Sequence, residues 1–141
     1  MKKTWLLLAL GAMVFIGGCK SSGSDKEIAT DMCGCFNMLK SSLPADGVKV
    51  FDKAAASATP KETFTEEIGK LEPETAKKVT EALMSTAQAG SPIYECLSKL
   101  DKKYKTTEKD QQVMTQRMVD GLKDNKDCNI MLALMRMNLK K

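Results

Sequence analysis

Residues 24–42 read SDKEIATDMCGCFNMLKSS, and this stretch decides the fold class. Ser24 followed three residues later by Glu27 matches a capping box, in which two side chains satisfy free backbone N–H groups at a helix start. Apolar side chains then recur at helical spacing: Ile28, Met32, Phe36, Leu39 and Leu43. The pattern predicts a helix that runs to about Ser42 and is ended by Pro44.

Beyond Pro44, similar signals divide the chain into further helical segments. Proline is favoured at the first helical position, so Pro60, Pro73 and Pro92 each indicate a helix start. Thr59 is the expected N-cap of the helix that starts at Pro60. Gly90 is expected to end the helix that starts at Pro73. The predicted segments are Gly47 to Ser57, Thr59 to Leu71, Glu74 to Ala89, Ser91 to Tyr104, Thr107 to Leu122 and Asp127 to Asn138.

Signals for β-strands are scarce, because the chain has no sustained alternation of apolar and polar residues. Apolar residues make up 43% of the chain and charged residues 28%, a balance typical of globular domains. We therefore predict an all-α fold, a small bundle of about five or six helices in one domain over residues 26–141.

The amino-terminal residues read as a targeting segment. Lys2 and Lys3 precede an uncharged apolar run, WLLLALGAMVFI, at residues 5–16. Twelve helical residues at about 1.5 Å each span roughly 18 Å, short of the roughly 30 Å of a bilayer core. The run is therefore typical of a signal peptide rather than of a permanent transmembrane helix.

The sequence Ile16-Gly17-Gly18-Cys19 resembles the lipobox of bacterial lipoproteins, although Gly17 stands where Ala or Ser is more usual. The resemblance implies cleavage of a signal peptide, residues 1–18, and attachment of diacylglycerol and a further acyl chain such as palmitate to Cys19. Residues 19–25 would then be the lipidated Cys and a short polar tether. It further implies export and anchoring to the bacterial cell envelope, with Lys20 favouring the outer membrane. The alternative is an ordinary secretory signal in which Cys19 only follows the cleavage point.

Four further cysteines, Cys33, Cys35, Cys96 and Cys128, lie within the predicted helical domain. An even number of Cys in an exported chain predicts two disulfides. A bond between Cys33 and Cys35 conflicts with helical geometry, and positions two apart on a helix point about 200° from each other. Each should therefore reach a separate helix, as 33–96 with 35–128 or as 33–128 with 35–96. Gly34 between them is expected to allow close approach of a neighbouring helix.

The same cysteines allow two other interpretations. Cys33-Gly34-Cys35 could exchange disulfides with a partner. Four thiolates could also bind copper or zinc together with nearby Met sulfurs, for which the candidates are Met32, Met38, Met131, Met135 and Met137. No strand precedes the motif, as a thioredoxin-like site would require, and Met on a helix is most often core filler. We therefore expect structural disulfides, with no metal and no cofactor.

Composition excludes several functions. The chain has no His, so catalysis that depends on an imidazole side chain is excluded, and no sequence motif indicates another catalytic site. Its formal net charge is +4, of which Lys2 and Lys3 supply two, so the mature domain is nearly neutral and nucleic acid is not an expected partner.

The final predicted helix is apolar around most of its circumference, so it is either central to the bundle or part of a docking face. The leading hypothesis is a non-catalytic binding or structural lipoprotein. Its expected partners are the membrane, through the lipid on Cys19, and another envelope protein.

Overall fold

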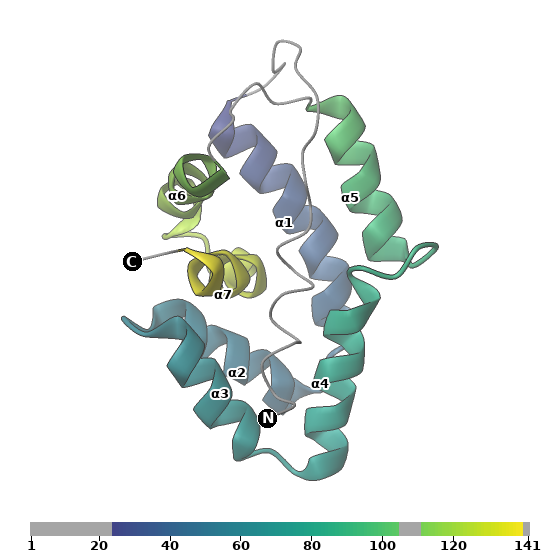
Figure 1. Ribbon diagram of the computed structural model, residues 1–141, viewed down its shortest axis with the longest axis vertical. Coiled ribbons are helices and arrows are strands. Elements are labelled where there is room, and N and C mark those ends of the chain that lie inside the picture. The colour runs from purple at the N-terminus through teal and green to yellow at the C-terminus, as the bar shows by residue number, and fades with distance from the viewer. Residues whose placement is uncertain (1–23, 105–110, 140–141) are drawn as a thin grey trace.

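The structure is a computed structural model, and it describes residues 24–104 and 111–139. These residues form seven α-helices and one short 3-10 helix, with no β-strand among them (Figure 1). The elements in chain order are α1 Asp25–Ser42, α2 Ala45–Ala56, α3 Pro60–Gly69, α4 Pro73–Ser85, α5 Pro92–Lys103, α6 Gln111–Leu122, η2 Lys126–Cys128 and α7 Asn129–Asn138. The all-α prediction is confirmed, and the seven α-helices correspond to the seven helical segments predicted along the chain, more than the about five or six expected in the bundle.

Helix α1 forms as its sequence predicts. The hydroxyl oxygen of Ser24 accepts a hydrogen bond from the backbone N–H of Glu27 at 3.2 Å, which satisfies one free donor at the helix start. Its buried residues follow the apolar stripe and include both cysteines: Ile28, Ala29, Met32, Cys33, Cys35, Phe36 and Leu39. Helix α1 begins at Asp25, the last residue of the segment 19–25 assigned to the tether, so the helix overlaps that segment by one residue.

Two helices, α1 and α7, organise the bundle. Helix α1 packs against α5 and α6, while α7 packs mainly against α2 and also touches α3 and α6. The two central helices contact each other, and α4 contacts α2 and α1 (Figure 1). Every other described α-helix therefore contacts α1 or α7 directly.

Helix α7 is enclosed on all sides along its first two turns. Five consecutive side chains are buried there: Ile130, Met131, Leu132, Ala133 and Leu134. A surface helix would expose a residue within each turn, so this run requires neighbours all round. Of the two interpretations of the final helix, the structure therefore supports the central one.

The helix predicted over residues 74–89 ends four residues early. Helix α4 stops at Ser85, and the chain continues through three turns in which each N–H bonds the carbonyl three residues before it. The hydroxyl of Thr86, which is fully buried, donates to the carbonyl of Leu83 at 2.7 Å and supports this tightening. Gly90 has φ 86°, a left-handed value, but it lies in the turn rather than at the helix end.

Several other predicted boundaries are corrected by the structure. Helix α3 ends at Gly69 rather than Leu71, and Thr59 occupies its N-cap without a side-chain cap bond. Asp127 does not cap the last helix, because the side chain of Asn125 accepts from its backbone N–H to start η2 instead. Thr107, predicted to precede a helix, lies outside the described residues.

The structure places the close approach of two helices at Gly47 and not at Gly34. Gly34 is exposed, and a Cβ built on it would meet no atom within 4 Å, so the predicted close helix approach there is wrong. Gly47 on α2 is buried, and a Cβ on it would lie 2.6 Å from Cγ2 of Val79 on α4. The close approach of helices therefore occurs between α2 and α4.

Substituting these two glycines is expected to shift stability in opposite directions. Gly34→Ala should raise the free energy of unfolding by about 0.5–1 kcal/mol, because Ala loses less backbone entropy in a helix. Gly47→Ala should lower it by about 1–3 kcal/mol, because the stiff, buried Val79 side chain would have to move. Urea denaturation of both variants measures these shifts, and a destabilised Gly34→Ala protein would contradict the open space seen beside α1.

Within the part of the chain that the structure describes, no helix has the length and apolar character needed to cross a membrane.

Candidate functional site: the disulfides and polar contacts of α1

The four cysteines of the helical domain form two disulfides that both start on α1. Cys33 is bonded to Cys128 with Cα atoms 5.3 Å apart, and Cys35 is bonded to Cys96 with Cα atoms 5.7 Å apart. Of the two pairings that the sequence left open, the structure has 33–128 with 35–96. The prediction that Cys33 and Cys35 each reach a separate helix is confirmed.

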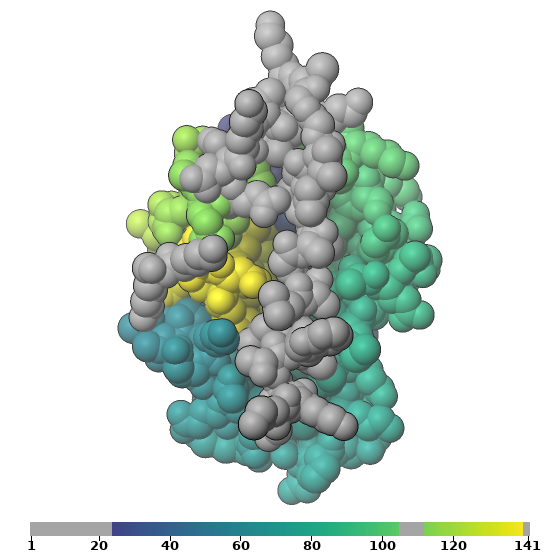
Figure 2. Space-filling view, viewed as in Figure 1, coloured from purple at the N-terminus to yellow at the C-terminus, as the bar shows by residue number. Residues whose placement is uncertain are grey.

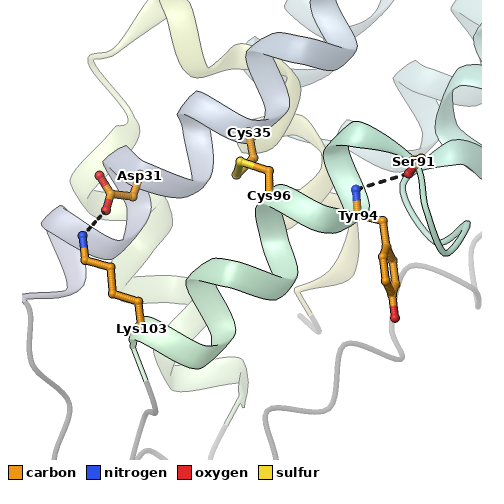
Figure 3. Close-up of a disulfide and its surroundings, with 6 residues drawn as sticks. All are labelled: Asp31, Cys35, Ser91, Tyr94, Cys96 and Lys103. Atoms are coloured by element: carbon orange, nitrogen blue, oxygen red, sulfur yellow. Dashed lines mark hydrogen bonds and ion pairs between the residues drawn. A yellow bond between two sulfur atoms is a disulfide. The ribbon is translucent and has the colours of Figure 1, made fainter.

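The two bonds link α1 to opposite parts of the bundle. Cys128 ends η2 and immediately precedes α7, so the first bond fixes the start of the central helix against α1. Cys96 lies in α5, so the second bond fixes an outer helix to the other flank of α1 (Figure 3). The rotation of about 200° between positions two residues apart on a helix explains this divergence.

Because all four sulfurs are bonded in pairs, none of these residues offers a thiolate to a metal or to a substrate in this structure. Groups of three or more Cys, Asp and Glu side chains that could hold a metal ion are absent from the described residues. The methionines considered for a soft-metal site differ in exposure, since Met131 is fully buried and Met38 is exposed on α1. Core packing accounts for the buried one.

A polar cluster joins the end of α5 to the start of α1. The ammonium of Lys103 lies 2.8 Å from Oδ2 of Asp31, and the Tyr104 hydroxyl donates to the same oxygen at 2.6 Å. The hydroxyl also lies 3.2 Å from Oε1 of Glu27, and the Lys103 ammonium stands 4.5 Å from the centre of the Tyr104 ring. Tyr104 is only 2% exposed, so the cluster supplies the hydrogen-bond partner that a buried phenol needs.

The electrostatics of this cluster are those of a structural contact. The Lys103 ammonium and then the Tyr104 hydroxyl lower the pKa of the Asp31 carboxyl, and the Asp31 carboxylate in turn raises the pKa of Tyr104 and of Lys103. Each pKa shift moves the group's pKa further from neutral pH, so Asp31 stays ionised and Lys103 and Tyr104 stay protonated. A general acid or base requires the opposite, a pKa close to the working pH.

Sequence reasoning missed this cluster. Lys103 lies in a lysine-rich stretch at the end of α5, where local sequence indicates no partner, yet it pairs with Asp31, seventy-two positions away. The available signal was Tyr104 itself, because a tyrosine that closes an apolar helical stripe must find a partner for its hydroxyl. The start of α5 was recognised correctly, since the Ser91 hydroxyl accepts from the N–H of Tyr94 at 3.2 Å (Figure 3).

Cys19, the residue assigned to lipidation, lies outside the described residues, as do the signal peptide and most of the tether. Among described residues, the large apolar side chains that remain exposed are Met84 on α4, Met38 on α1 and Val113 on α6. Met84 is the most exposed, at 59%. The residues of α7 that were candidates for a docking face are mostly buried, so surface contacts with a partner would fall on other helices.

Comparison of the chain with protein-family models, with curated proteins and with solved structures gives no match.

Proposed function

We propose that this protein is a lipoprotein of the bacterial cell envelope, anchored through acyl chains on Cys19. Of the two membranes, Lys20 favours the outer one. Its helical domain serves as a non-catalytic binding or structural module that contacts another envelope protein. The observation that carries the proposal is the pair of disulfides across the helical domain. Structural disulfides are typical of exported proteins, and the amino-terminal sequence has the signal and lipobox pattern of such a protein.

The position of α1 also fits an anchored domain. Ser24 caps α1 only five residues after Cys19, and α1 carries one end of both disulfides. A tether that leads straight into α1 would transmit any pull on the anchor to the helix that is covalently joined to α5 and to the start of α7. Two or three acyl chains hold such a domain on a membrane without further contacts, because each buried methylene contributes about 0.8 kcal/mol.

Substituting the proposed lipidation site tests the anchor. In cells that express the full chain, Cys19→Ser is expected to abolish incorporation of labelled palmitate and to move the protein out of the membrane fraction. Ser22→Ala, in the same segment, serves as the matched control and should remain labelled and membrane-bound. Continued palmitate labelling of the Cys19→Ser protein would refute the lipoprotein assignment.

Site-specific photo-crosslinking tests the docking role. Among the described residues Met84 is the most exposed large apolar side chain, and methionine adapts to varied surfaces. A photo-reactive residue at position 84 is therefore expected to yield one discrete adduct in cells. The same photo-reactive residue at Lys61, which is exposed on α3, the helix that precedes α4 in the chain, is the control and should yield none. Indistinguishable ladders of adducts at both positions would count against a defined partner on this surface.

A further inference from the structure

The two disulfides differ in how well the protein shields them. Cys33 and Cys128 are 5% and 2% exposed, so both sulfurs of that bond lie within the core. Cys35 is equally buried, at 1%, but its partner Cys96 is only partly buried. An incoming thiolate must reach a sulfur atom, and Cys35–Cys96 is the less shielded of the two bonds, on its Cys96 side.

The helices that the two bonds hold also differ in their support. Helix α7, which follows Cys128, contacts α1, α2, α3 and α6. Helix α5 packs chiefly against α1, and within it only Ile93 and Leu97 are buried. It forms an edge of the molecule together with α4 (Figure 2). Opening the bond at Cys96 therefore removes a main attachment of an outer helix, whereas the centre of the bundle keeps its contacts.

We propose that the Cys35–Cys96 bond is a redox latch: a dithiol reductant opens it while Cys33–Cys128 stays closed, and the opening releases the first half of α5 from α1. The second half of α5 stays attached, because Lys103 and Tyr104 contact Asp31 beyond the disulfide. The inference concerns the folded domain alone and holds with or without the lipid anchor.

The exchange balances as two ordinary thiol–disulfide steps. A thiolate of the reductant attacks Sγ of Cys96, the protein S–S bond breaks, and Cys35 leaves as a thiolate that takes a proton from solvent. The second thiol of the reductant then attacks its own sulfur in the mixed disulfide, and Cys96 leaves as a thiolate and is protonated. The protein disulfide gains two electrons and two protons, and the dithiol becomes a disulfide.

Graded reduction tests the order of opening. The protein is purified from cells that express the full chain, in detergent if it fractionates with membranes, and is treated with dithiothreitol before the free thiols are trapped with N-ethylmaleimide. Mass mapping is expected to show Cys35 and Cys96 trapped at least about tenfold faster than Cys33 and Cys128, because access controls the rate of exchange. Simultaneous opening, or earlier trapping of Cys33 and Cys128, would overturn the proposal.

Hydrogen–deuterium exchange on the half-reduced protein tests the release of α5. Amides of residues 92–97 should lose protection, while those of α1 and α7 remain protected. If residues 92–97 stay as protected as in the oxidised protein, there is no release. If α1 and α7 lose protection as well, the bond is a general staple rather than a latch.

A pair of variants provides the matched comparison. Cys35→Ser with Cys96→Ser should reproduce the exchange pattern of the half-reduced protein without any reductant. In Cys33→Ser with Cys128→Ser, the remaining bond should still open at the wild-type rate. Should the second variant fail to fold, the half-reduced wild-type protein still decides the question, because it requires no substitution.

Discussion

The Cys33→Ala/Cys128→Ala double variant is expected to lose about 2–5 kcal/mol of unfolding free energy, with its midpoint of thermal unfolding lowered by roughly 10–20 °C. The bond joins residues 95 positions apart, so it removes much conformational freedom from the unfolded chain. It also holds the start of α7, whose first two turns form the centre of the core. A loss of this size is a large share of the roughly 5–15 kcal/mol that keeps a small domain folded.

The Cys35→Ala/Cys96→Ala variant is the control that separates two causes of this loss. Its bond joins residues 61 positions apart, and the loop-entropy model gives nearly the same value, about 4–5 kcal/mol, for both bonds. Packing predicts a difference, because α5 is an outer helix while α7 is central. We expect thermal unfolding followed by circular dichroism to show the larger loss without Cys33–Cys128, whereas equal losses would mean that unfolded-chain entropy alone sets the contribution.

The cysteine spacing shows how far sequence reasoning reaches in this protein. The divergence of Cys33 and Cys35 follows from helical rotation alone, so the need for two distant partners was predictable. The choice between Cys96 and Cys128 depends on which flank of α1 meets α5 and which meets η2. That choice is made by the packing of all seven helices, and local pattern carries no information about it.

Helix ends show the same division between local and distant causes. Ser24 and Ser91 were found because each bonds an N–H three residues along the chain. The early end of α4 was missed, since the hydroxyl of buried Thr86 bonds Leu83 only where the surrounding core holds it. The contact between Lys103 and Asp31 was missed for a similar reason, because it joins residues from two helices that only the fold brings together.

The second large effect is expected at Met131 in α7, where the sequence allowed both core packing and a soft-metal ligand. Met131 is fully buried on a helix that contacts four other helices. Met131→Ala should lower the free energy of unfolding by about 2–5 kcal/mol, because the lost contacts and the remaining cavity both destabilise a core that relaxes only partly. Met84→Ala, at the methionine that is most exposed in the described part of the chain, should change it by less than about 0.5 kcal/mol.

Met131→Leu distinguishes packing from metal binding at the same position. Leucine has a similar volume and no sulfur, so a packing role predicts a loss below about 1.5 kcal/mol in urea denaturation. A thioether ligand would not tolerate the change, because leucine has no lone pair to donate to a soft metal. If Met131→Leu destabilised the protein as much as Met131→Ala, the sulfur itself would be required at this position, and the interpretation of α7 as a packing element would be wrong.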